Sequence, residues 1–232
     1  MNDYYTSILV NRILGERTGI PLVGVTGCMG SGKSTFCQNL LGYSNISGRR
    51  MNYLNFDELV KTLYTGRDSS SEKVLSKLRD HFGAQIFDKK KLNLKKLGAI
   101  VFNDPLSRER LAEIITIPLL ESLRPKLANK TDITLVDAAY FTEYHLLSLV
   151  NHNIILVSCD EPERVARVMK RDNITLEQFE ARASSQHTPE EKRSLILEAQ
   201  VQVDHGFFFE VNTSRQINYP EVIAKLEEYF RI

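Results

Sequence analysis

A short glycine-rich run carries the clearest chemistry in the sequence. Gly27-Cys-Met-Gly-Ser-Gly-Lys-Ser34 matches the pattern GxxxxGK[ST]. The glycines let the backbone curl so that its N–H groups face phosphate oxygens. In such a loop the lysine, here Lys33, meets the β- and γ-phosphates of a nucleotide, and the next hydroxyl, here Ser34, ligates Mg²⁺. The sequence therefore predicts a nucleotide-binding loop in which Lys33 also acts in catalysis, although the loop alone does not separate a kinase from a switch GTPase or a motor ATPase. Its predicted nucleotide-binding residues are Gly27, Cys28, Met29, Gly30, Ser31, Gly32, Lys33, Ser34 and Thr35.

Two carboxylates follow predicted strands at the edge where a parallel sheet opens onto its ligand. Asp57 comes after the strand predicted at 51–56, where it could orient an acceptor hydroxyl and accept its proton. Asp137 ends the strand predicted at 133–136, where it could hold Mg²⁺ or its waters together with Ser34. Helix capping is the alternative for both, and for Asp57 it is as well supported by position alone.

A stripe of arginines is the third chemical feature. Arg164, Arg167 and Arg171 have the spacing i, i+3 and i+7, which places them on one face of a helix, and Arg182 follows after a short break. Guanidinium groups bind phosphoryl oxygens bidentately and stay charged. A solvated helix face is the alternative. Because the stripe follows the fourth predicted strand, we favour a lid in which Arg167 and Arg171 are catalytic.

A regular order of elements would position these residues. Five apolar runs have strand length, and most are near-continuous, as in parallel strands that are buried on both faces. Helical patterns lie between them. The alternation predicts an α/β fold with a five-stranded parallel sheet flanked by helices. The predicted strands are 21–26, 51–56, 133–136, 153–158 and 207–211.

Several helix starts are marked by capping residues. In a capping box, a side chain accepts the N–H three residues on, and a Glu or Gln at that position returns the bond. The pairs with this spacing are Ser69–Glu72, Thr175–Gln178 and Thr188–Glu191. Proline at the first helical position predicts further starts at Pro105 and Pro189.

The segment 57–130 carries several helices and no convincing strand, which is too long for a simple crossover. We predict that it is a helical acceptor-binding insertion. The nucleotide-binding core would then comprise 21–56 and 131–232, with the lid at about 160–195. An N-terminal helical extension, 1–20, would precede the core.

A lysine cluster at 89–91 and 95–96 is either a solvated helix start, which position favours, or a contact for an acceptor phosphate.

Composition limits the partners. The 232 residues carry 30 Lys plus Arg against 29 Asp plus Glu, a net charge of +1. This balance predicts neither nucleic acid nor a membrane surface as the main partner. Cys28, Cys37 and Cys159 form no CxxC pair, and no apolar run suits a signal peptide or a membrane span. We expect a cytoplasmic protein, with a monomer as the default, although the sequence fixes no oligomeric state.

These residues occur in the order of the motifs of dephospho-coenzyme A kinases, a family that the chain resembles from Val23 onward. Gly24-Val-Thr-Gly27 through Ser34-Thr35 resembles the family's G-x-T-G-x-x-G-S-G-K-[ST]-T. Asn55-Phe-Asp57 stands where the family has D-A-D, and Asp137-Ala-Ala-Tyr-Phe-Thr-Glu143 aligns with D-[IV]-P-L-L-F-E. The first of these motifs is more specific than a generic phosphate-binding loop.

Further matches lie in the insertion and toward the end of the chain. They are Phe82-Gly83 and Leu97-Gly-Ala-Ile-Val-Phe102 for F-G and L-x-x-[IV]-V-F, Arg167 to Asp172 for R-x-x-x-R-D, Arg182 and Gln186 for R-x-x-x-Q, and Val211-Asn212 for a late strand and asparagine.

The resemblance implies a P-loop kinase with a five-stranded parallel core, a helical coenzyme A-binding domain and a lid. It implies that Mg-ATP phosphorylates the 3′-hydroxyl of the ribose of dephospho-CoA, a small-molecule substrate. The matched residue Asp57 would serve as the base, and Asn212 would lie beside the adenine of ATP.

Most departures from the family pattern fall on the acceptor side. The family's L-D-R is Leu92-Asn-Leu94, its H-P is Ile117-Pro118, and the first Asp of D-A-D is Asn55; the proline of P-L-L-F-E is Ala139. The ATP machinery is therefore better supported than the acceptor. Two alternatives stay open: a P-loop kinase of another nucleoside-like or hydroxyl metabolite, and a nucleotide-binding regulator without turnover.

Overall fold

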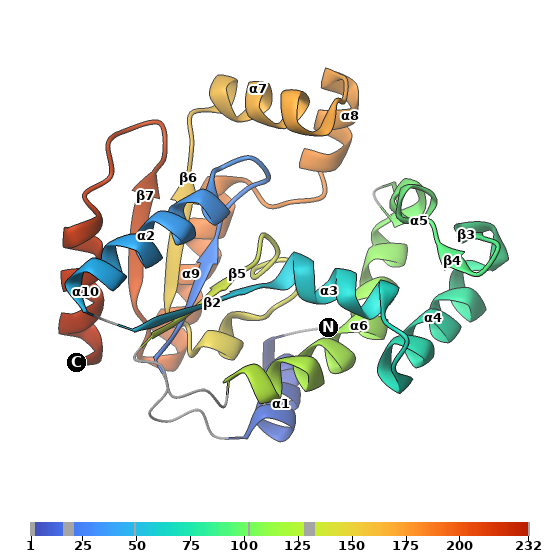
Figure 1. Cartoon of the computed structure of the whole chain (residues 1–232), viewed down its shortest axis with the longest axis horizontal. Coiled ribbons are helices and arrows are strands. Elements are labelled where there is room, and N and C mark those ends of the chain that lie inside the picture. Colours follow the sequence, from blue (N-terminus) through green and yellow to red (C-terminus); the bar gives the residue numbers. More distant parts are fainter. Residues whose placement is uncertain (1–2, 16–20, 49, 102, 128–132, 232) are drawn as a thin grey trace.

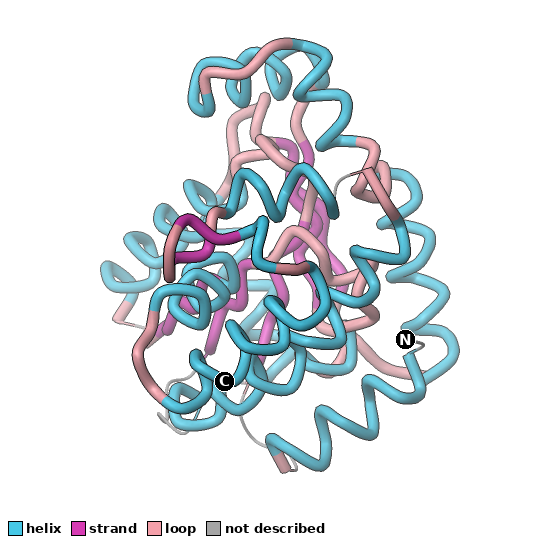
Figure 2. Tube along the Cα trace, turned by 90° about the vertical axis from the view of Figure 1, so that its right-hand side faces the viewer, coloured by secondary structure: helices cyan, strands magenta, loops and turns pink. Residues whose placement is uncertain are grey.

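The computed structural model describes residues 3–15, 21–48, 50–101, 103–127 and 133–231. Its centre is a sheet of five parallel strands in the order β2-β5-β1-β6-β7, with helices on both faces (Figure 1). Turned by a quarter, the strands lie inside a shell of helices (Figure 2). The predicted α/β fold is thus confirmed. The strands are β1 (Leu22–Thr26), β2 (Met51–Asn55), β5 (Ile133–Asp137), β6 (Ile154–Ser158) and β7 (Phe208–Asn212).

The near-continuous apolar character of the strands reflects two separate cores. Val23 and Val25 of β1 pack with side chains of α2 (Lys33–Ser47) and α10 (Tyr219–Phe230) on one face. Leu22, on the same strand, belongs to the core of the other face. Because successive side chains of a strand point to opposite faces, an apolar residue is needed at nearly every position. This signal explains why every predicted strand end lies within one residue of the observed one.

Between β2 and β5 the chain forms a helical arm beside the sheet (Figure 1). Its helices are α3 (Phe56–Thr65), α4 (Ser69–Phe82), α5 (Leu94–Val101) and α6 (Pro105–Leu127), with the short 3₁₀ helix η1 (Ala84–Ile86). The expectation of no strand in this segment is wrong at one point. The strands β3 (Phe87–Asp88) and β4 (Lys91–Leu92) form an antiparallel pair. Such short strands carry no periodic pattern that the sequence could reveal.

The lysine cluster lies on this hairpin and the start of α5. Lys89 takes a left-handed backbone with φ 58° at the turn, and the Lys96 ammonium contacts an Asp88 carboxylate oxygen at 2.6 Å. Both observations favour the solvated alternative for these two lysines.

The predicted helix starts are confirmed with one exception. Thr175 and Thr188 both form capping boxes, and α6 and α9 (Pro189–Val203) begin with proline. The expected box at Ser69 is wrong by one residue. The carboxylate of Asp68 caps α4, accepting the Ser71 N–H at 2.8 Å, because it precedes Ser69 and is an equally good cap.

Two more parts of the chain frame the site. The helices α7 (Glu161–Asp172) and α8 (Leu176–Ala183) lie above the carboxyl edge of the sheet, in the region predicted to be a lid (Figure 1). At the opposite side, α1 (Asp3–Leu14) packs against both α6 and the 3₁₀ helix η2 (Leu147–Val150), so it joins the arm to the core. In the described ranges we find no helix long and apolar enough to span a membrane.

Some predictions fall outside the described residues. These are positions 1–2 and 16–20 of the N-terminal extension, Phe102 of the L-x-x-[IV]-V-F block, and the predicted boundary at residues 130 and 131.

Candidate active site

The glycine-rich run forms the loop between β1 and α2. A Cβ atom on Gly27 would lie 2.0 Å from the Val157 carbonyl oxygen, and Gly30 has a φ of 82°, so only glycine fits either position without strain. The Lys33 ammonium folds back over this loop and donates to the carbonyl oxygens of Gly27 and Cys28 at 2.9 and 3.1 Å. Burial lowers the pKa of Lys33, while Asp137 and Asp57 act to raise it. The loop and the N-terminus of α2 therefore form a cradle for phosphate groups.

Asp137 lies at the metal side of this cradle. Its side chain is almost fully buried, and its Oδ2 accepts hydrogen bonds from the Ser34 hydroxyl at 2.7 Å and from the Tyr53 hydroxyl at 2.9 Å. Burial, with the Asp137 charge, raises the pKa of Tyr53 to about 12, so the phenol keeps its proton at neutral pH. The structure thus brings Ser34 and Asp137 together as predicted.

Sequence reasoning missed Tyr53. Its role is hidden in the sequence because its partner Asp137 is distant in the chain and lies alongside only once β2 pairs with β5, which puts Asn55 in register with Asp137.

Asp57 lies in the first turn of α3, and the capping alternative for it does not hold. The side chain of Asn55 caps this helix by accepting the Glu58 N–H at 3.1 Å. Partial loss of water around the Asp57 carboxyl raises its pKa, the Lys33 ammonium opposes this, and the Asp137 charge adds to it. The charge of Arg171 also acts on Asp57. Asp57 therefore shares one electrostatic environment with the phosphate cradle and the lid.

A cavity of about 430 Å³ opens on the outer side of the cradle. Its lining includes the Tyr219 ring, which stacks on Phe36 with ring centroids 5.8 Å apart. An apolar, aromatic wall beside a phosphate cradle suits a purine base. The residues lining it are Gly32, Thr35, Phe36, Asn39, Arg167, Thr213, Arg215, Ile217 and Tyr219. The predicted adenine neighbour Asn212 is not one of them; it braces the adjoining turn through Asp160 at 3.1 Å and the Ser214 N–H at 2.8 Å.

The predicted lid arginines have different surroundings. Arg167 donates to the Thr213 hydroxyl at 3.0 Å, and that hydroxyl donates to the Ser31 carbonyl oxygen of the cradle at 2.8 Å. Arg171 instead forms a bidentate pair with Asp172, at 2.7 and 3.0 Å, and Arg182 contacts the same carboxylate at 3.0 Å. Arg167 is therefore already at the cradle, whereas Arg171 must exchange its partner to reach a phosphate.

The comparisons with known proteins agree with this geometry. The family model described as dephospho-CoA kinase matches residues 21–204. The chain belongs to the dephospho-CoA kinase family. A dephospho-CoA kinase of Carboxydothermus hydrogenoformans is 31% identical over 85% of this chain and 91% of its own length. One from Listeria innocua is 32% identical over 73% and 82% of the two chains. A solved structure, TT1252 from Thermus thermophilus, shares the fold with a TM-score of 0.66 at 22% identity, over 90% of this chain and 97% of its own.

Dephospho-CoA kinases need an acceptor site, and two neighbouring cavities that share lining residues lie between the arm and the core. One, of about 70 Å³, is lined by Asp57 and by apolar side chains. The other, of about 420 Å³, is lined by Arg108, His145 and His187 among others. Tyr144 lines both cavities, as do two residues of α6. We refer to these two cavities together as the candidate acceptor path, since the smaller one is lined by Asp57.

Two departures from the dephospho-CoA kinase pattern lie elsewhere. Leu94 begins α5 and is about half exposed, at 49%. Ile117 lines a groove with Lys73 and Val74 of α4, whereas its neighbour Thr116 lines both cavities beside Asp57. The replacement at Ile117 therefore faces away from the path described above.

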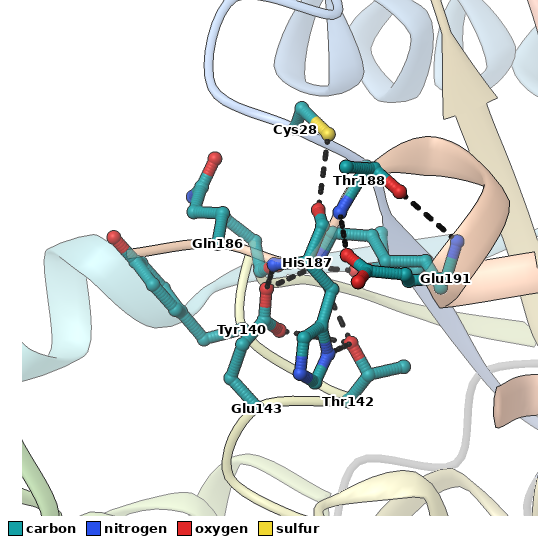
Figure 3. A network of polar contacts seen from close by, with 12 residues as sticks. Cys28, Tyr140, Thr142, Glu143, Gln186, His187, Thr188 and Glu191 are labelled. Atoms are coloured by element: carbon teal, nitrogen blue, oxygen red, sulfur yellow. Dashed lines mark hydrogen bonds and ion pairs between the residues drawn. The ribbon is translucent and has the colours of Figure 1, made fainter. Parts of the chain in front are cut away.

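A buried ion pair supports the acceptor side of the cradle, within a polar network of which Figure 3 labels Glu143, Gln186 and His187. The Lys192 ammonium, fully buried, contacts a Glu143 carboxylate oxygen at 2.6 Å, and that oxygen also accepts the His187 N–H at 2.8 Å. The preceding residue, Gln186, accepts the Met29 N–H at 2.8 Å through its side-chain oxygen. This Glu143–Lys192 pair thus ties the loop after β5 to the start of α9 and, through Gln186, to the cradle. Sequence reasoning missed Lys192, whose partner is far away in the chain.

Ser34 and Asp137 are the residues beside the loop that could hold a metal ion carried by a nucleotide. Within the described residues, no group of three or more His, Cys, Asp or Glu side chains could hold an ion. Mg²⁺ usually binds through one or two carboxylates, substrate phosphates and waters, so a single carboxylate next to a hydroxyl and a phosphate cradle suits it. The donor set present therefore fits Mg²⁺ carried by a nucleotide.

Proposed function

We propose that the chain transfers the γ-phosphoryl group of Mg-ATP to the 3′-hydroxyl of dephospho-CoA, giving coenzyme A and ADP. Family membership supports the substrate pair. The observation that carries the chemistry is the placement of Asp57, whose carboxyl lies in the field of Lys33 and lines the smaller cavity between the arm and the core. This placement supports a role for Asp57 as the base between the phosphate cradle and the acceptor.

Asp57 and Lys33 take complementary parts in the transfer. The acceptor oxygen attacks the γ-phosphorus, a P–O bond forms on one side, and the bond to the β-phosphate oxygen breaks on the other. Asp57 accepts the hydroxyl proton, which its raised pKa favours. Lys33 stabilises the charge on the phosphate oxygens. Ser34 and Asp137 would hold a Mg²⁺ ion, which would supply positive charge beside the same oxygens.

The arginines of α7 would offset the remaining negative charge of the ATP phosphates. Arg167, held near Ser31 through Thr213, is placed to meet the phosphates from the outer side. Arg171 would leave Asp172 when α7 and α8 close, since its charge already acts on Asp57. Closure would also exclude water from the transferred group.

A coupled ADP-release assay with Mg-ATP and dephospho-CoA tests this function. We expect ADP release that depends on the acceptor, and a product heavier by one phosphate on mass spectrometry. Adenosine and other hydroxyl metabolites serve as competing acceptors, and the Asp57→Asn protein is the matched control. Faster turnover with another acceptor would assign a different substrate, and ATP binding with no acceptor-dependent ADP would contradict the kinase function.

We further propose that the enzyme works in the cytoplasm as a monomer. The net charge of +1 and the free thiols of Cys28, Cys37 and Cys159 support the location, because disulfides are rare in the cytoplasm. Size-exclusion chromatography coupled to light scattering tests the oligomeric state.

A further inference from the structure

The Tyr53 hydroxyl lies between the metal-side carboxylate and the cap of the helix that carries Asp57. It is 2.9 Å from Asp137 Oδ2 and 3.1 Å from the side-chain nitrogen of Asn55. The Ser34 hydroxyl reaches the same Asp137 oxygen at 2.7 Å. A single line of hydrogen bonds therefore runs from the start of α3 to the start of α2.

The direction of this line follows from which groups can donate. Asn55 Oδ1 accepts the Glu58 N–H, so its amide nitrogen must be the atom that faces Tyr53. An amide nitrogen only donates, so it occupies a lone pair of the Tyr53 oxygen. The single phenolic proton then points to the Asp137 carboxylate, which only accepts. Asn55 thus fixes the orientation of the Tyr53 hydroxyl.

The bonds also decide which oxygen of Asp137 a metal can use. Among the described residues, both hydrogen bonds to this carboxylate fall on Oδ2. Oδ1 is then the oxygen left for a metal ion or its waters. Partners of this kind hold a ligating carboxylate in one orientation, and their loss usually lowers metal affinity.

We propose that Tyr53 is a positioning residue for the metal site, oriented by Asn55, and that it fixes the Asp137 carboxylate for Mg²⁺ bound with ATP. The inference rests on the proposed function for the identity of the nucleotide. This role of Tyr53 also gives a physical reason for asparagine at position 55, where the family pattern D-A-D has aspartate. An aspartate here would accept a hydrogen bond from the Tyr53 hydroxyl and turn that hydroxyl away from Asp137.

The test measures nucleotide binding without turnover. The affinity for a non-hydrolysable ATP analogue is determined by calorimetry with Mg²⁺ and with EDTA, and the ratio of the two affinities reports the contribution of the metal. We expect Tyr53→Phe to lower this ratio about tenfold, the lower end of the usual effect of such partners. Binding in EDTA should stay unchanged. Tyr64→Phe, on the last turn of α3, is the matched control, and its ratio should equal the wild-type value.

A second variant tests the direction of the proton and does not depend on Tyr53→Phe folding well. Asn55→Asp keeps an oxygen to cap α3 and should lower the ratio several-fold. In the Tyr53→Phe background, the same change should lack this effect, since no phenolic proton remains to be diverted. An unchanged ratio in Tyr53→Phe, an equal loss in Tyr64→Phe, or the same effect of Asn55→Asp in both backgrounds would overturn the proposal. Acceptor-dependent ADP release by the wild-type protein reports separately on the proposed function.

Discussion

Lys33 is the side chain on which the charges of both site carboxylates, Asp57 and Asp137, act. Its ammonium is partly buried, held by two carbonyl oxygens of the loop, and faces the charges of Asp57 and Asp137. We expect Lys33→Ala to lower kcat by at least a hundredfold, since a charge aimed at the transferred group stabilises the transition state by several kcal/mol. Steady-state ADP release measures this, and Lys61→Ala, on the exposed face of α3, is the control. Near-wild-type turnover would remove the loop from the mechanism.

Asp57→Asn should separate turnover from binding. We expect kcat to fall by about 10²–10⁴-fold with Mg-ATP affinity nearly unchanged, because the carboxylate acts on the acceptor hydroxyl. Thermal stability should not fall, since Asn55, not Asp57, caps α3. A carboxyl whose pKa is raised on folding disfavours the folded state once it ionises, so its removal should not destabilise at neutral pH. A joint loss of melting temperature and ATP affinity would instead indicate a structural role.

The pH dependence of kcat should also report on Asp57 as the base. Asp57 must be ionised to act as a base, so kcat should fall as pH drops through its raised pKa. We therefore expect the acid limb of the kcat profile to lie above pH 3.8, the ordinary value for an aspartate carboxyl. The residual activity of Asp57→Asn should lack this limb. An unchanged limb in that variant would assign it to another group.

At the scale of elements, the Glu143–Lys192 pair holds the loop after β5 against α9. Lys192→Met would leave the Glu143 carboxylate buried without a counter-charge, which typically costs about 3–5 kcal/mol. We expect urea unfolding to show a loss of this size. The double variant with Glu143→Gln should recover most of it, since no unpaired charge remains. A double variant as unstable as the single one would show that packing, not charge, matters here.

Some strands and helix caps can be predicted from the sequence, whereas the roles of two buried or partly buried polar side chains cannot. Strands such as Ile133–Asp137 are predictable because burial on both faces demands an unbroken apolar run. The capping boxes at Thr175 and Thr188 are predictable because their partners lie within one turn. Tyr53 and Lys192 were missed because each acts through a partner distant in the chain, Asp137 and Glu143. The types of these two residues are informative only when the fold has brought the partners together.

At the scale of the molecule, the arm and the core meet at the acceptor path, and α5 belongs to the arm. Leu94, half exposed at the start of α5, can be replaced by arginine without loss of core packing. Because the family pattern has arginine at this position, we expect Leu94→Arg to lower the KM for dephospho-CoA roughly ten- to hundredfold with little change in kcat, as for a charge-assisted contact of about 1.5–3 kcal/mol made equally in ground and transition states.

The matched variant is Ile117→Arg, which would project into the groove beside α4 instead of the acceptor path. It should leave the KM for dephospho-CoA unchanged. Equal KM values for Leu94→Arg and the wild type would mean that α5 does not contact bound dephospho-CoA.

The pairing of β5 with β1 and β2 places Asp137 level with Val25 and Asn55. Within a strand, a shift of one residue would turn the Asp137 side chain to the opposite face of the sheet. We therefore expect an insertion or deletion inside β5 to abolish phosphoryl transfer, because it moves the Asp137 carboxylate away from Ser34. One in the hairpin of the arm changes only a surface turn. The hairpin of the arm therefore tolerates changes in chain length that would separate Asp137 from Ser34 if they fell within β5.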